Sequence, residues 1–281
     1  MIIIKNKNEL TAHLNNLKRA GNSVGFVPTM GALHQGHLSL INYANQDNDV
    51  TVVSIFVNPT QFNDKNDYSK YPRILDEDIE KLKKVKCDIL FSPDENEMYP
   101  SEDNRDFDFG NIDKVMEGAH RPGHFRGVAL IVSKLFEAVI PDKAYFGEKD
   151  FQQVAIIKNL TKQLNYNIDI IPCPIVREED GLAMSSRNML LTEQQRDNVS
   201  LISRTIFEAK EKAKNMTVSE TKNWVIRTIN ENPFLEVEYF EIVDDTNLES
   251  INSWDQKFEK VGCIAVQVGT IRLIDNIRFY S

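Results

Sequence analysis

The chain has 281 residues, of which 41% are hydrophobic and 27% charged, a composition typical of a soluble globular protein with one large or two modest domains. Its net charge of −9 and its pI near 5.2 argue against nonspecific binding to nucleic acid or to an anionic membrane surface. No apolar run approaches the roughly 20 residues that cross a bilayer, and the apolar start is too short for a signal peptide. The cysteines are odd in number and lack a metal-binding spacing, so we expect buried thiols in a reducing cytosol.

Short apolar strands alternate with helices through the first 175 residues. We expect strands at 1–5, 24–27, 50–57, 88–91, 144–146 and 168–171. We expect helices at 7–20, from 37 to the polar stretch 45–49, and at 75–85, 127–139 and 151–164, with polar loops at 63–72 and 94–110. This alternation predicts an α/β layer with a parallel sheet, in which ligands bind beyond the carboxyl ends of the strands.

The order of elements changes near residue 175. A long helix at 192–214 and a second helix at 218–231 precede strands at 237–243, 262–268 and 271–274. The last two strands are predicted to form a hairpin through Gly269-Thr270. We therefore divide the chain into an α/β domain, 1–175, and a smaller α+β domain, 176–281.

A turn rich in glycine and histidine follows the predicted strand 24–27. It reads Met30-Gly31-Ala32-Leu33-His34-Gln35-Gly36-His37. A helix that begins here offers backbone N–H groups to a phosphate, and the two imidazoles can stabilise charge on an α-phosphate under attack. Two surface histidines on a first helical turn are the alternative, but the glycines between strand and helix favour the phosphate site.

Polar side chains also follow two other strands. Asn58 and Gln61 come after strand 50–57, where an ordinary Asn-Pro turn is the alternative. Because this point lies at the carboxyl edge of the sheet, Gln61 is a candidate for binding a substrate hydroxyl or carboxylate.

The segment after strand 144–146 reads Gly147-Glu148-Lys149-Asp150. Lys149 is a candidate phosphate ligand, Asp150 a candidate Mg²⁺ ligand, and Gln153 lies on the same first helical turn. A solvated helix start explains this tetrapeptide equally well.

Two basic segments complete the candidates. Met184-Ser185-Ser186-Arg187 combines hydroxyls with a guanidinium, which suits an anion clamp on a mobile loop, although a plain exposed loop is the alternative. Arg121 and His124 precede the apolar helix, and they can meet an anionic substrate or cap that helix. We rank them below the other groups, and we assign the stripe 128–136 to the core.

Together these segments resemble the pantothenate synthetase (pantoate–β-alanine ligase) family. The likeness runs from about residue 22 to 190 and continues weakly to 274–276. It is carried by the turn at 28–37, by 53–62, and by four later blocks, Tyr71-Pro72-Arg73, Arg121-Pro122-Gly123-His124-Phe125, the stretch from Phe146 to Gln153, and Met184-Ser185-Ser186-Arg187-Asn188.

The resemblance implies a Rossmann-like nucleotidyltransferase domain over which the C-terminal domain closes as a lid. It also implies an ATP-dependent ligase of coenzyme A biosynthesis, which activates pantoate as pantoyl adenylate and then lets β-alanine displace AMP. The family members require Mg²⁺ and are usually cytoplasmic homodimers.

The resemblance further implies a role for each matching residue. Pantoate would be held by Gln61 and Gln153, with Asn58 in the same substrate site. The nucleotide would be contacted by residues Met30 to His37, Gly147 to Asp150, Val176 through its backbone, and Met184 to Arg187. His37 would be the proton donor, with His34 and Lys149 also catalytic and Asp150 near the metal.

Two other functions share parts of this pattern. A nucleotidyltransferase that stops at adenylylation or cytidylylation of a phosphate ester would use the same turn but has no need for the pair of glutamines. A nucleotide-binding regulatory protein would tolerate loss of His37 or Lys149, and this chain has both.

Overall fold

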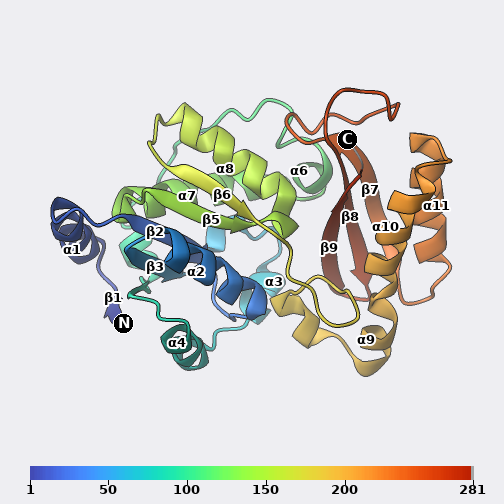
Figure 1. Cartoon of the computed structure of the whole chain (residues 1–281). Coiled ribbons are helices and arrows are strands. Elements are labelled where there is room, and N and C mark those ends of the chain that lie inside the picture. Colours follow the sequence, from blue (N-terminus) through green and yellow to red (C-terminus); the bar gives the residue numbers. More distant parts are fainter. Residues whose placement is uncertain (280–281) are drawn as a thin grey trace.

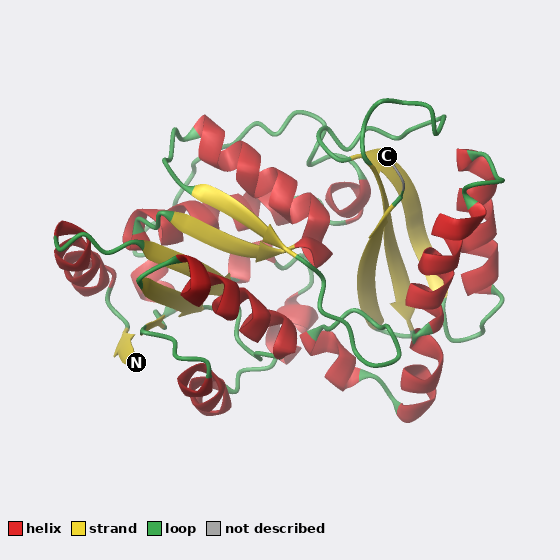
Figure 2. Ribbon diagram, viewed as in Figure 1, coloured by secondary structure: helices red, strands yellow, loops and turns green. Residues whose placement is uncertain are grey.

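The structure, a computed structural model, describes residues 1–279 and contains two sheets side by side, each with its own helices (Figures 1 and 2). The larger sheet has the order β1-β4-β3-β2-β5-β6, and all of its neighbouring strands are parallel, as the sequence predicted. Its strands are β1 Ile2–Ile4, β2 Val24–Thr29, β3 Val50–Ile55, β4 Ile89–Phe91, β5 Lys143–Gly147 and β6 Asp169–Cys173.

Helices cover both faces of this sheet. Those in the first half are α1 Lys7–Arg19, α2 Gln35–Asp47, α3 Lys65–Lys70, α4 Leu75–Lys84, α5 Glu95–Met98, α6 Met116–His120, α7 His124–Val139 and α8 Phe151–Gln163, with single turns η1 Pro59–Gln61 and η2 Glu148–Asp150. Successive strand residues point to opposite faces, so Phe26 packs toward α1, α7 and α8 while Val27 packs toward α2 and α4. Burial on both faces explains why these strands are uniformly apolar in sequence.

The smaller sheet is antiparallel, in the order β7-β8-β9, and has its own hydrophobic core. Its elements are η3 Ser186–Leu190, α9 Glu193–Val199, α10 Leu201–Lys212, α11 Val218–Asn230, β7 Glu236–Asp244, β8 Lys260–Val268 and β9 Ile271–Arg278. Helices α10 and α11 cover one face, as Figure 1 shows, and the predicted hairpin of the last two strands is confirmed. The other face packs against α6 and α8 through a cluster that includes Met116, Phe151 and Val261.

Several local predictions were wrong. The segment 63–72 contains α3, begun by the side chain of Asp64, which accepts the N–H of Asn66. The predicted helix 192–214 is two helices that meet at Ser200, whose N–H donates to the carbonyl of Asn198 in place of a regular helical bond. The apolar helix α7 begins earlier than predicted, at His124, after Gly123 in a left-handed conformation. Within residues 1–279, no helix is both long and apolar enough to cross a membrane.

Candidate active site

A carboxylate on α4, that of Asp78, binds the backbone of the turn after β2. Gly31 has φ +82°, and the next residue, Ala32, also has a positive φ of 49°. The buried carboxylate of Asp78 accepts the N–H groups of Ala32 and Leu33, each at 2.8 Å. These two N–H groups are therefore bound within the protein, and α4 fixes the strained turn. Sequence reasoning missed Asp78, because nothing near it in helix 75–85 marks it as buried.

Two imidazoles cap the N-terminus of α2. His34 Nδ1 accepts the N–H of Gly36 at 3.1 Å, and His37 Nδ1 accepts the N–H of His34 at 3.3 Å. A Cβ on Gly36 would lie 2.8 Å from His34 Cε1, so the ring position requires glycine there. Since both Nδ1 atoms accept, each neutral ring carries its proton on Nε2.

Burial keeps both rings neutral. Desolvation, followed by the nearby Lys149 ammonium, lowers the pKa of His34 to about 4. Desolvation, followed by the neighbouring His34 ring, lowers the pKa of His37 well below its ordinary value. At neutral pH these rings are thus hydrogen-bond donors through Nε2, and neither is an imidazolium. The pKa shift favours donation of a hydrogen bond over transfer of a proton by His37.

Asn58 orients Gln61. The buried Asn58 side chain accepts the Tyr99 hydroxyl at 2.6 Å and donates from Nδ2 to Gln61 Oε1 at 3.1 Å. This donation fixes the amide of Gln61 so that its Nε2 lies 3.1 Å from Met30 Sδ, beside the turn. Gln61 therefore presents its donor to the site. The polar atoms of Asn58 are engaged by protein groups, which makes it a support for Gln61.

The turn η2 is tied to the smaller sheet. Asn276 Nδ2 on β9 donates to the carbonyls of Glu148 at 2.8 Å and Lys149 at 3.1 Å. The carboxylate of Glu148 pairs with Arg278 at 2.8 Å, so it is directed to the smaller sheet. Predicted as a nucleotide contact, Glu148 instead fastens the two sheets together.

The serine-arginine loop meets α3. Ser185 Oγ accepts the N–H of Arg187 at 3.2 Å, which begins η3. Arg187 Nη2 lies 2.9 Å from Asp67 Oδ2 on α3, and Ser186 Oγ lies 3.5 Å from the Tyr71 hydroxyl. The segment 63–72, predicted to be a loop, thus closes against the predicted anion clamp.

These segments enclose one cavity of about 230 Å³ at the carboxyl ends of β2, β3, β5 and β6. The predicted site residues that line it are Met30, His34, Gly36, His37, Asn58, Gln61, Gly147, Lys149, Asp150, Gln153, Val176, Met184, Ser185, Ser186 and Arg187. The predicted site residues outside its lining are Gly31, Ala32, Leu33, Gln35 and Glu148. An apolar wall, missed because it was assigned to the core alone, comes from Val128, Ile131, Val132 and Leu135 of α7 and from Phe56.

Chemically, the cavity combines neutral hydrogen-bond donors, an ammonium and a guanidinium with an apolar wall. The donors and cations suit the phosphates of a nucleotide. The uncharged amides of Gln61 and Gln153 suit a small hydroxylated acid, since they bind its carboxylate without neutralising its charge. Such a site can activate a carboxylate at a phosphate while excluding water.

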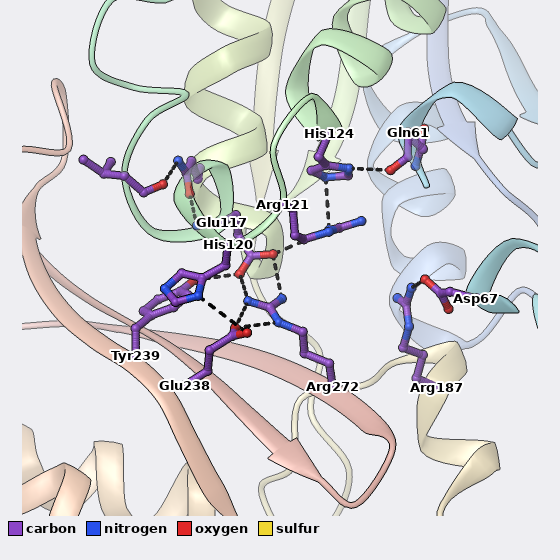
Figure 3. A network of polar contacts seen from close by, with 12 residues as sticks. Gln61, Asp67, Glu117, His120, Arg121, His124, Arg187, Glu238, Tyr239 and Arg272 are labelled. Carbon is purple, nitrogen blue, oxygen red and sulfur yellow. Dashed lines mark hydrogen bonds and ion pairs between the residues drawn. The ribbon is translucent and has the colours of Figure 1, made fainter. Parts of the chain in front are cut away.

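Arg121 and His124 lie beside this cavity and do not line it. They belong to a polar network that joins α6, the first turn of α7, η1 and the smaller sheet (Figure 3). Of the two roles that the sequence left open for His124, contact with an anionic substrate or a cap on the helix, the first finds no support in the ring contacts, because both ring nitrogens face protein groups.

Comparison with known proteins gives one consistent result. A family model described as pantoate-beta-alanine ligase matches residues 2–278. The pantothenate synthetase of Bacteroides thetaiotaomicron is 53% identical over 279 residues, 99% of each chain, and that of Porphyromonas gingivalis is 50% identical over 259 residues, 92% of each. The crystal structure of pantothenate synthetase from Thermus thermophilus matches with a TM-score of 0.93 and 38% identity over 100% of both chains. A pantoate-beta-alanine ligase from Francisella tularensis, complexed with beta-gamma ATP and beta-alanine, matches with a TM-score of 0.83 and 39% identity over 99% of this chain and 97% of that one.

Proposed function

The chain belongs to the pantoate-beta-alanine ligase family, and from that premise we propose how its own residues carry out the reaction. The enzyme condenses (R)-pantoate with β-alanine at the expense of ATP, giving pantothenate, AMP and pyrophosphate through a pantoyl adenylate. A carboxylate is a poor electrophile, and adenylation gives it a good leaving group. The adenylate must then be shielded from water until the amine attacks.

On the nucleotide side, we assign the α-phosphate to the two histidines and Lys149. Their donors converge on the cavity with no full charge on either ring, so they stabilise charge that develops as pyrophosphate leaves. We assign the departing phosphates to the Ser185-Ser186-Arg187 loop, whose guanidinium and hydroxyls are suited to phosphate oxygens. Val176 contacts the adenine through its backbone in this scheme.

On the acid side, we assign pantoate to Gln61 and Gln153. The observation that carries the proposal is that both amides share one cavity with the histidines and Lys149, next to an apolar wall for the aliphatic part of the acid. The pantoate carboxylate is already ionised at pH 7, so attack on the α-phosphate needs no general base. Asn58 acts through Gln61.

Mg²⁺ is part of the proposal as a partner of ATP. Within residues 1–279, no group of three or more His, Cys, Asp or Glu side chains is arranged to hold a metal alone. Mg²⁺ in such enzymes is bound by one or two carboxylates together with substrate phosphates, and Asp150 on the cavity fits as the single carboxylate. When bound, the ion would neutralise phosphate charge.

The remaining proposals concern the whole protein. We propose a boundary near residue 175, with 1–175 binding the substrates and 176–281 closing over them. We also propose that the enzyme acts as a homodimer in the cytoplasm, as the family resemblance implies.

One assay tests the function. Pyrophosphate release from ATP is measured with pantoate alone, and AMP and pantothenate are measured after β-alanine is added. We expect adenylate formation with pantoate and full turnover only with both acids. Pyrophosphate release that needs neither acid would indicate a different nucleotidyltransferase, and ATP binding without release would indicate a regulatory protein.

A further inference from the structure

His124 contacts the main chain of Gln61 from outside the cavity. Its Nδ1 lies 2.9 Å from the carbonyl oxygen of Gln61, and its side chain is buried (Figure 3). The N-terminus of α7 packs tightly on the same turn, since a Cβ on Gly127 would lie 2.3 Å from the carbonyl oxygen of Thr60. The turn η1 is thus supported from behind by α7.

The neighbouring Arg121 fixes the tautomer of His124. Arg121 Nη1 lies 3.2 Å from His124 Nε2, and a guanidinium can only donate. The Nε2 atom must therefore accept, which leaves the proton on Nδ1, where it is donated to Gln61. Burial, followed by the charge of Arg121, lowers the pKa of His124 to about 4, so the ring stays neutral in this arrangement.

Arg121 is itself anchored through Glu117 to the smaller sheet. Its Nη1 lies 3.5 Å from Glu117 Oε2. Arg272 on β9 donates to both oxygens of Glu117, at 2.8 and 2.7 Å, and the Tyr239 hydroxyl on β7 donates to Oε1 at 2.7 Å. A continuous chain of contacts thus runs from the smaller sheet to the carbonyl of Gln61.

We propose that His124 is a positioning residue for pantoate binding, which acts by fixing the carbonyl of Gln61 through an Nδ1–H tautomer enforced by Arg121. With its carbonyl held by His124 and its side-chain oxygen held by Asn58, Gln61 has one orientation for its Nε2 donor, which lies beside Met30 Sδ. This inference rests on the proposed role of Gln61 in holding pantoate.

Two substitutions separate the halves of the imidazole. His124→Asn retains a donor at the position of Nδ1 but has no group at the position of Nε2. His124→Gln retains a polar group at the position of Nε2 but has no donor at the position of Nδ1. We expect His124→Gln to raise KM for pantoate about tenfold, the value of one lost hydrogen bond, with KM for ATP within about twofold of wild type. His124→Asn should restore KM for pantoate to within about threefold of wild type. Equal effects of the two substitutions, or parallel changes in both KM values, would overturn the proposal.

A readout independent of activity is the tautomer itself. In a ¹⁵N-resolved spectrum of the histidine rings, with His124 identified by its loss in His124→Asn, we expect the proton on Nδ1. A proton on Nε2 would contradict the proposal even if a variant folds poorly. Gln61→Ala serves as the reference for the proposed function. If it leaves KM for pantoate unchanged, the assignment of pantoate to Gln61 fails; if it raises that KM while His124→Gln does not, only the positioning role fails.

Discussion

The two imidazoles at the start of α2 act as caps on one side and as donors on the other. Each Nδ1 accepts a backbone N–H, so each Nε2 has a proton to donate to a substrate. Neutral rings supply this donor without attracting the ground-state phosphate as strongly as a full charge would. Their effect should therefore appear mainly in the transition state, where charge accumulates.

His37→Ala tests this role directly. Loss of the Nε2 donor should slow adenylate formation about 10²-fold or more, as removal of one transition-state donor commonly does. The dissociation constant for ATP should change by less than about threefold, because a neutral donor contributes little to the binding of ATP in its ground state. Single-turnover pyrophosphate release and calorimetry of ATP binding measure the two quantities.

Two control variants test whether the effect of His37→Ala comes from the lost donor and from its place in the cavity. His37→Gln, which retains a donor near the position of Nε2, should recover part of the rate, and His13→Ala on α1 should leave it unchanged. If His37→Ala shifts only the ATP dissociation constant, the transition-state role is wrong.

The lowered pKa of His34 predicts that the free energy of unfolding depends on pH. Its folded pKa of about 4 lies below the unfolded value near 6.5, so between these pH values the unfolded chain binds one more proton. This contribution to stability is present above pH 6.5 and is lost as the pH falls toward 4. In His34→Asn, which keeps an N-cap side chain, the free energy of unfolding should depend on pH less steeply by about 1.4 kcal/mol per pH unit in this window. Denaturant titrations at pH 7.0, 6.0 and 5.0 measure it, and parallel pH profiles would contradict it.

The sequence predicted the residues that line the cavity better than it predicted their supports. His34, His37, Gln61 and Lys149 were predicted because each follows a strand in a local pattern. Asp78 was not, because it reaches Ala32 across 46 residues and nothing near it marks it as buried. The tautomer of His124 likewise depends on Arg121 and on a carbonyl 63 residues away. Long-range hydrogen bonds of this kind leave no local signal.

An ion pair joins helix α3 to the turn η3 beside the cavity. Arg187, the proposed phosphate ligand, pairs with Asp67 of α3. A triphosphate must therefore displace or share this guanidinium. The pair is partly exposed, so its strength is modest.

Asp67→Asn should make ATP bind more tightly. Freed from its carboxylate partner, Arg187 becomes available to the phosphates, and we expect KM for ATP to fall about two- to fivefold, in proportion to the modest strength of an exposed pair. KM for pantoate should stay unchanged, and the gain should shrink at high salt. The matched loss of charge is Asp76→Asn, at an exposed residue on the first turn of α4. An unchanged or higher KM for ATP in Asp67→Asn would show that the pair does not compete with the nucleotide.

Among the elements, the buried strands were the most predictable. The runs at 24–27 and 50–57 became β2 and β3 because burial on both faces leaves a continuous apolar signal. The short helices α3, α5 and α6 were missed because each is four to six residues long, too short to show an apolar stripe. The break between α9 and α10 is confined to one residue, Ser200, and the composition of this segment does not reveal it.

Polar contacts beside the cavity join the two sheets, in addition to the apolar cluster that includes Met116, Phe151 and Val261. Glu117 is buried, and although burial alone raises its pKa, the hydrogen bonds from Arg272 lower it to about 2. Arg278 to Glu148 and Asn276 to the carbonyls of η2 add further links. The sequence predicted both layers but not this junction, because its partners come from α6, η2 and the smaller sheet. Glu117 therefore takes part both in the junction of the two sheets and in the contacts that lead to His124.

Arg272→Met should uncouple the two parts of the molecule. Removing one partner of a buried ion pair leaves Glu117 without its main counter-charge, and such losses cost about 3–5 kcal/mol. Both tryptophans of the chain, Trp224 and Trp254, pack on the core of the smaller sheet. Tryptophan fluorescence therefore reports this part alone, while circular dichroism reports both.

In the wild type, we expect the two signals to follow one denaturation curve; in Arg272→Met, we expect a lower midpoint and two separate curves. The exposed Arg227→Met on α11 controls for charge. Glu117→Gln combined with Arg272→Met should restore part of the stability, because the buried side chain of Glu117, the partner of Arg272, is then neutral. Coincident curves in Arg272→Met would show that apolar packing of Met116, Phe151 and Val261 holds the sheets together without the ion pair. The chain of contacts from Arg272 through Glu117 and Arg121 to His124 would then position Gln61 without contributing to the cooperativity of unfolding.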